Sequence, residues 1–194
     1  MPARDADGKL WSIQFVGDEG KVWIKDSRKA GTMHVVEPTG KGTLDVLADS
    51  RHGAVIVAEG YATASTIHED TGRPVVVAFD CGNLRAVAEA VRAKFPDRPV
   101  LIAADNDHAR LNEKGEKENI GVIKAGDAAR AVGGDFVAPA FTAEEMAKGL
   151  TDFNDLGRAR GKAAVGQAIE EAVAKLARTH RVAAAPDRDY AVAM

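Results

Sequence analysis

Residues 54–60 read AVIVAEG, an apolar run that ends in an acidic residue and a glycine. A short apolar run rich in β-branched residues is typical of a strand that is covered on both faces. Similar runs occur at residues 74–79 (PVVVAF) and 100–104 (VLIAA), and a shorter one at 136–138. Because helix-like segments separate these runs, the pattern predicts an α/β protein whose parallel strands alternate with helices.

The intervening segments have apolar residues at helical spacing. We expect helices at residues 61–69, 84–94, 120–132 and 161–177. With the four strands they predict a parallel sheet of about four strands that has helices on both faces.

The first 48 residues show a different pattern. Residues 10–15 and 21–25 alternate apolar and polar side chains around a turn-forming segment, which predicts a β-hairpin, and residues 32–37 form another strand-like run. We therefore expect a small antiparallel β appendage at 1–48, an α/β domain at 49–178 and a flexible C-terminal tail at 179–194.

Composition excludes several classes of function. The 194 residues include 26 basic and 29 acidic ones, a balance that argues against a protein whose main task is to coat nucleic acid. Cys81 is the single cysteine, which leaves no intramolecular disulfide and no cysteine-based zinc site. Because no signal peptide and no apolar run of about 20 residues occur, we expect a cytoplasmic protein without a membrane partner.

Acidic residues follow three of the predicted strands. Glu59, Asp80 and Asp105 leave consecutive strands, and Asp107 lies two residues further on. The carboxyl ends of parallel strands meet at the edge of the sheet where ligands bind. Crowded carboxylates repel one another unless a cation neutralises them, and hard oxygen ligands favour Mg²⁺ or Mn²⁺. The sequence therefore predicts a metal site at this edge.

A structural alternative stays open for some of these residues. An acidic or amide residue after a strand is often the N-cap of the next helix, which suits Asp80 and Asn83 and also Asp105 or Asp107 taken singly. Glu59 suits this alternative less well because Glu is a poor N-cap.

The same residues carry a resemblance to a known family. A strand that ends in Glu-Gly at 59–60, followed by a later strand that ends in Asp-x-Asp at 105–107, resembles the Toprim domain of topoisomerases and bacterial-type primases. Residues 59–64 (EGYATA) are similar to the E-G-Y-A-T-G/A box of conjugative-plasmid and satellite-phage primases. The segments RDADGKL (4–10), AFDCGNL (78–84) and TDFNDL (151–156) also resemble these proteins, so the likeness covers about residues 4–178.

The resemblance implies a Toprim-like, Rossmann-like fold and the catalytic core of a DNA primase. Such a nucleotidyltransferase makes short RNA primers from NTPs on single-stranded DNA during plasmid or phage replication and conjugative transfer. Asp105 and Asp107 would hold Mg²⁺ or Mn²⁺, and Glu59 would act as a general base or as a carboxylate that organises the metal. Further carboxylates that could form an outer shell, or could simply cap turns and helices, are Asp80, Asp152 and Asp155.

The resemblance and the charge pattern also suggest contacts with substrate. Candidates for binding nucleotide or template are Gly60, Tyr61, Thr63, Asn83, Arg28 and Lys29, and further candidates for phosphate contact are Lys114, Lys117 and Lys124. Taken singly, each of these cations fits an ordinary solvated surface better than a phosphate contact, and Tyr61 could equally serve packing.

Two other functions stay open. The same carboxylates could serve a Toprim nuclease, or the chain could be a non-catalytic module that binds nucleic acid or a helicase within a larger mobile-element protein. No cysteine array for a template-reading zinc module precedes residue 59. We therefore expect a catalytic core from a longer primase or relaxase fusion, with a helicase or relaxase as partner.

Overall fold

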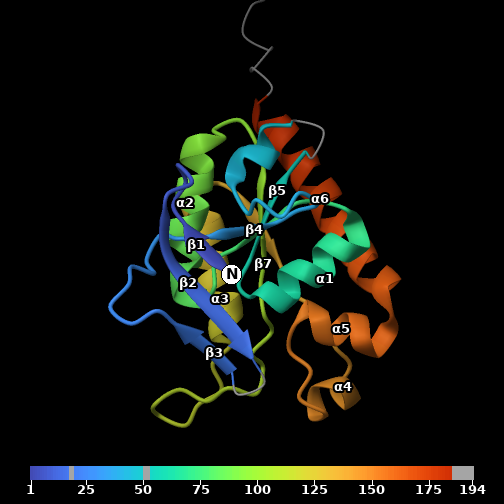
Figure 1. The fold of residues 1–194 in the computed structure, drawn as a ribbon. Helices are drawn as coiled ribbons and strands as arrows, with labels where there is room; N and C mark the ends of the chain where they lie inside the picture. Colours follow the sequence, from blue (N-terminus) through green and yellow to red (C-terminus); the bar gives the residue numbers. More distant parts are fainter. Residues whose placement is uncertain (18–19, 50–52, 185–194) are drawn as a thin grey trace, which may run out of the picture.

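The computed structural model describes residues 1–17, 20–49 and 53–184, which form two sheets (Figure 1). In spatial order, the main sheet contains β4 (His34–Val36), β6 (Val75–Val77), β5 (Val55–Ala58), β7 (Val100–Ala103) and β8 (Asp135–Val137). The last four strands are parallel to one another, and β4 pairs with β6 in the antiparallel sense. The predicted α/β fold with four parallel strands is confirmed.

Helices cover both faces of this sheet (Figure 1). One face carries α2 (Leu84–Lys94) and α3 (Ile120–Ala131), and the other carries α1 (Tyr61–Thr71), α5 (Phe153–Arg160) and α6 (Lys162–Ala184). Successive residues of a strand point to opposite faces. Val55 and Val57 therefore belong to the core beneath α2 and α3, whereas Ile56 and Ala58 belong to the core beneath α1, α5 and α6.

The second sheet is a small antiparallel one. It consists of β1 (Pro2–Arg4), β2 (Leu10–Gly17) and β3 (Gly20–Trp23), so the predicted hairpin is confirmed, while residues 18 and 19 of its turn lie outside the described part. Residues 32–37 are predicted from their pattern to belong to this appendage, but the structure pairs His34–Val36 with β6 of the main sheet. The physical reason is burial: β4 covers the edge of β6 and inserts Val35 into the main core.

Two helices were not expected from the pattern. The short helix α4 (Ala143–Ala147) buries no residue and begins at a capping box formed by Thr142 and Glu145, and α5 buries only Phe153 and Leu156. Such short segments give little periodic signal. The final helix α6 continues to Ala184 through part of the predicted tail, and residues 185–194 of that tail lie outside the described residues.

Several segments gather at the carboxyl end of the parallel strands. The β2–β3 hairpin, the loop between β7 and α3, and helices α4 and α5 lie at the same end of the molecule (Figure 1). Trp23 of β3 packs edge-to-face against Phe79, which follows β6, with a ring separation of 4.9 Å. This aromatic contact connects the appended sheet to the edge where the acidic residues lie. Within the described residues, no helix is long and apolar enough to cross a membrane.

Candidate metal centre

Glu59 directly follows β5 and is half-buried. Its Oε2 atom is buried without a hydrogen-bond partner among the described residues. Burial raises the pKa of Glu59 to about 7, and the nearby charges of Asp107 and Asp80 add to the increase. A buried carboxylate oxygen without a donor is the arrangement that a bound cation would satisfy.

Asp105 occupies the corresponding position after β7. Its Oδ1 accepts a hydrogen bond of 3.3 Å from the hydroxyl of Thr63 in α1. Burial raises the pKa of Asp105 to about 7, and the charges of Glu59, Asp152 and Asp107 raise it further, in that order. Glu59 and Asp105 therefore lie close enough for the negative charge at this edge to raise the pKa of both carboxyls.

Asp107 is held by the start of α3. Its backbone N–H donates to Oδ1 of Asn119 at 2.9 Å, and its own Oδ2 accepts from the backbone N–H of Gly121 at 3.2 Å. Asn119 is also the N-cap of α3. Arg110 lies 4.0 Å from the same carboxylate oxygen of Asp107. The Asp-x-Asp segment is thus joined to the start of α3 through the backbone N–H and the side chain of Asp107.

These three carboxylates have the chemistry of a divalent-cation site. They supply hard oxygen atoms, one of them without a donor, in a region where burial and mutual repulsion favour a positive charge. Across the described residues, however, no three His, Cys, Asp or Glu side chains are already gathered around one point as metal ligands. The assignment of Glu59, Asp105 and Asp107 as ligands stays a prediction.

The outer carboxylates act as caps and also contribute charge. Asp80 accepts from the backbone N–H of Asn83 at 3.0 Å, and its charge raises the pKa of Glu59. Asp152 accepts from the backbone N–H of Asp155 at 2.7 Å as the N-cap of α5, and its charge raises the pKa of Asp105. Asp155 accepts in turn from the backbone N–H of Thr151. For Asp80 and Asp152, capping and an outer-shell position are compatible.

Two residues predicted to contact nucleotide, Thr63 and Asn83, make hydrogen bonds within the protein. Thr63 is buried, and its hydroxyl serves Asp105. Asn83 is also buried: its Nδ2 donates to the carbonyls of Thr32 and Ala78, and its Oδ1 accepts from the backbone N–H of Gly31. Because both amide hydrogens of Asn83 are used, this side chain joins the appendage to the sheet rather than presenting donors to a ligand.

The other predicted contacts lie at or near the surface. Tyr61 is exposed at the first turn of α1, directly after Gly60. Arg28 stacks over Trp11 and donates through Nε to the carbonyl of Ala30, so its guanidinium is already engaged. Lys29 lies over the ring of Trp23. The remaining predicted phosphate contacts are exposed: Lys114, Lys117 and Lys124.

Lys21, a cation at this edge, is not predicted by any sequence pattern. Lys21 of β3 lies close to Gly60, since its Nζ is 3.9 Å from the position that a Cβ on Gly60 would occupy. The positive charge of Lys21 acts to lower the pKa of both Glu59 and Asp152. The alternation of β3 places Lys21 on the same face as Trp23. No local pattern, however, shows which part of the main domain that face approaches.

Comparison with known proteins places this fold and edge in a family. The Toprim domain model matches residues 54–163, more than half of the chain. The chain therefore belongs to the Toprim domain family. The resemblance predicted from the EGYATA and Asp-x-Asp motifs is confirmed.

Two longer proteins are similar over most of the chain. A DNA primase TraC of Escherichia coli is 49% identical over 148 residues, which make up 76% of this chain and 13% of that protein. A second DNA primase TraC of Escherichia coli is 45% identical over 146 residues, or 75% of this chain and 10% of that protein. The chain thus spans only a small part of each relative's length. No solved structure matches it.

Proposed function

We propose that this chain is the catalytic core of a DNA primase, which joins NTPs into a short primer on single-stranded DNA with Mg²⁺ or Mn²⁺. The observation that carries the proposal is the carboxylate pair Glu59 and Asp105, both half-buried at the carboxyl edge with a pKa of about 7. This pair lies in a Toprim domain that is similar to two proteins named DNA primase. Perturbed carboxylates at a sheet edge are typical of catalytic sites.

Each residue of the edge would have a separate role in the reaction. Asp105 and Asp107 would hold the ion, which when bound would neutralise the triphosphate and polarise its α-phosphate. Thr63 would orient Asp105, and the N–H of Gly121 would orient Asp107. Glu59, with a pKa of about 7, is suited to accept the proton of the attacking 3′-hydroxyl as pyrophosphate leaves.

Metal binding is the first test. Titration of Mn²⁺ into the chain, followed by electron paramagnetic resonance of the free ion, should show a site that is lost in the Asp105→Asn/Asp107→Asn double variant. Asp127→Asn, which changes an exposed carboxylate on α3, is the matched control and should retain the site. Unchanged Mn²⁺ binding in the double variant would overturn the proposed ligands.

Activity is the second test. Incorporation of labelled NTPs on single-stranded DNA should be abolished by Glu59→Gln and by Asp105→Asn but retained by Asp127→Asn. Degradation of the template without NTPs would instead indicate a nuclease. A binding module would hold single-stranded DNA equally well, or more tightly, after Asp105→Asn because a negative charge has been removed.

A further inference from the structure

Among the residues that the structure describes, Lys21 is a cation without a partner beside the proposed catalytic edge. Within the described part of the chain, its Nζ makes no hydrogen bond and no ion pair. The side chain is exposed, yet its positive charge acts on the half-buried carboxyls of Glu59 and Asp152. By contrast, Arg110 lies 4.0 Å from Asp107, so its charge is partly used.

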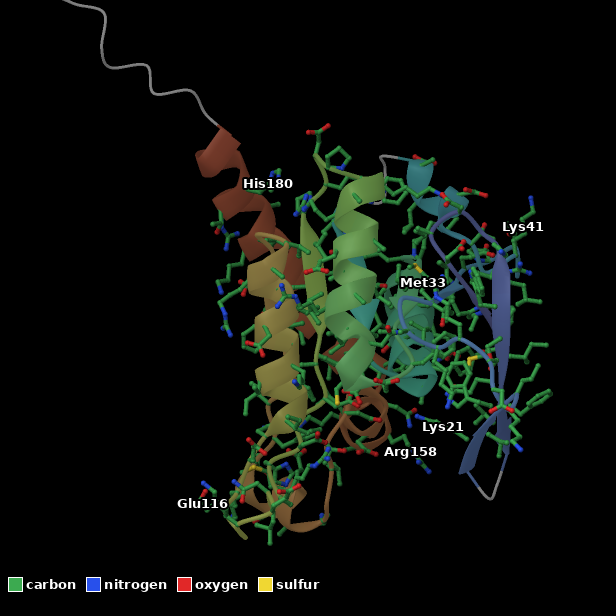
Figure 2. The ribbon with its side chains drawn as sticks, turned by 90° about the vertical axis from the view of Figure 1, so that its left-hand side faces the viewer. Lys21, Met33, Lys41, Glu116, Arg158 and His180 are labelled. Carbon is green, nitrogen blue, oxygen red and sulfur yellow. The ribbon has the colours of Figure 1, made fainter. Side chains whose placement is uncertain are left out.

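The appended sheet holds Lys21 in this place. Lys21 and Trp23 are two residues apart on β3 and so lie on the same face of the strand. Trp23 is anchored against Phe79 at the carboxyl end of β6. The same contact therefore directs the Lys21 side chain toward the sheet edge. Lys21 lies near the lower end of the appended sheet, and Lys41 lies near the upper end (Figure 2).

Gly60 leaves room for an anion next to this ammonium group. Gly60 is the N-cap of α1, and no side chain in the described part of the chain caps the helix at this end. The first N–H groups of a helix carry partial positive charge and need an acceptor. With Lys21 Nζ near the missing side chain of Gly60, an ammonium group and the start of a helix face the same space.

We propose that Lys21 binds the β- and γ-phosphates of the nucleoside triphosphate and positions it at the carboxylate edge. This inference rests on the proposed function, because it assigns a residue to the substrate of that same site. A triphosphate brings more negative charge than one divalent ion neutralises, and an ammonium group at the edge supplies part of the difference without competing for the metal ligands. The role of the appended sheet is then to position Lys21 at the carboxylate edge.

The test separates the nucleotide from the metal. Binding of ATP and of AMP, each with Mn²⁺, is measured by calorimetry for the wild-type chain, Lys21→Ala, Lys21→Arg and Lys41→Ala. We expect Lys21→Ala to weaken ATP binding about tenfold, the loss typical of one charge-assisted hydrogen bond, and to leave AMP binding nearly unchanged. Lys21→Arg should retain most of the affinity for ATP, and the distant, exposed Lys41→Ala should match the wild type.

Binding of Mn²⁺ alone distinguishes the possible failures. In Lys21→Ala this binding should be equal or slightly tighter, because a neighbouring positive charge is removed. If Mn²⁺ binds normally but Lys21→Ala retains full ATP affinity, or loses ATP and AMP equally, the role of Lys21 is overturned while the metal site stands. If the wild-type chain binds no Mn²⁺, the proposed function fails, and the assignment of Lys21 fails with it.

Discussion

The hydroxyl of Thr63 in α1 donates a hydrogen bond of 3.3 Å to Oδ1 of Asp105, 42 residues away in the sequence. This contact joins the helix that follows the Glu-Gly motif to the carboxylate of the Asp-x-Asp motif. It also lowers the pKa of Asp105, against the larger effect of burial. Thr63 therefore helps to keep Asp105 ionised and ready to bind a cation.

Replacing Thr63 with valine should weaken metal binding. Thr63→Val keeps the shape of the side chain but removes the donor, so the pKa of Asp105 should rise further and Mn²⁺ affinity at pH 7 should fall about tenfold. Thr66→Val is a matched control on the same helix, because the Thr66 hydroxyl donates over the same 3.3 Å to Asn154. Equal Mn²⁺ affinities in the two variants would contradict the role of Thr63.

Gly121 and Gly126 of α3 should respond in opposite ways to alanine. A Cβ on Gly121 would lie 2.4 Å from the backbone oxygen of Asp105, whereas a Cβ on Gly126 would meet only side-chain atoms at 3.5 Å or more. We expect Gly121→Ala to lower the free energy of unfolding by about 2 kcal/mol and to displace the Asp-x-Asp segment. Gly126→Ala should raise that free energy by about 0.5–1 kcal/mol because alanine favours the helix.

Urea unfolding measures both glycine variants, and Mn²⁺ titration shows whether the site is disturbed. Loss of Mn²⁺ binding in Gly121→Ala alone is the expected pattern. A Gly121→Ala variant as stable as the Gly126→Ala variant would contradict this prediction. It would show that the start of α3 can move away from the backbone oxygen of Asp105 without loss of stability.

The half-buried carboxyls of Glu59 and Asp105 should make the metal-free protein less stable as the pH rises. The pKa of Glu59 is about 7 in the folded chain, above the ordinary value of 4.5, so the folded state binds the proton more tightly than the unfolded state. The free energy of unfolding should therefore fall between about pH 4 and pH 7 and remain low above that range. Urea unfolding at several pH values, without divalent ions, measures this dependence.

Glu59→Gln should remove part of this pH dependence. At pH 8 the metal-free variant should exceed the wild type by about 2 kcal/mol in free energy of unfolding, and the difference should vanish near pH 4. Glu113→Gln, which changes an exposed residue of the loop after β7, should follow the wild-type curve. A wild-type stability that is flat from pH 4 to pH 8 would contradict the raised pKa.

Metal affinity should show the opposite trend with pH. A cation must displace the protons that Glu59 and Asp105 retain at neutral pH, since each pKa is about 7. Mn²⁺ affinity should therefore increase from pH 6 to pH 8, and the slope should decrease in Glu59→Gln. Calorimetry at three pH values gives both the affinity and the protons released, and an affinity independent of pH would argue against these ligands.

Asn83 should be critical for stability rather than for substrate binding. Asn83→Ala would leave the carbonyls of Thr32 and Ala78 and the N–H of Gly31 without their present partner, which should cost about 2–4 kcal/mol of unfolding free energy. Asn112→Ala, in the loop between β7 and α3, should cost less than about 1 kcal/mol because water can replace its hydrogen bonds. Similar losses in the two variants would contradict the anchoring role.

The strands and most helices were predictable because their signals are local. Val55–Ala58, Val75–Val77 and Val100–Ala103 are continuous apolar runs, and α2 has the bounds that its apolar spacing and the following Pro96 predict. By contrast, α4 buries nothing and therefore shows no apolar spacing. A strand was predicted at residues 32–37, but its local pattern does not indicate which sheet it joins, and the structure pairs β4 with β6.

Sequence alone determined which residues end the parallel strands, and therefore that Glu59, Asp80 and Asp105 reach one edge, because strand geometry converts local apolar runs into a common rim. Only the tertiary structure decided which polar side chains at this edge are used in internal hydrogen bonds and which remain available to a ligand. Thr63 and Asn83 are buried by contacts with residues 42 and 51 positions away, while Lys21 is brought beside Gly60 by the packing of Trp23 on Phe79. These outcomes depend on long-range packing, and no local pattern of apolar and polar residues specifies such contacts.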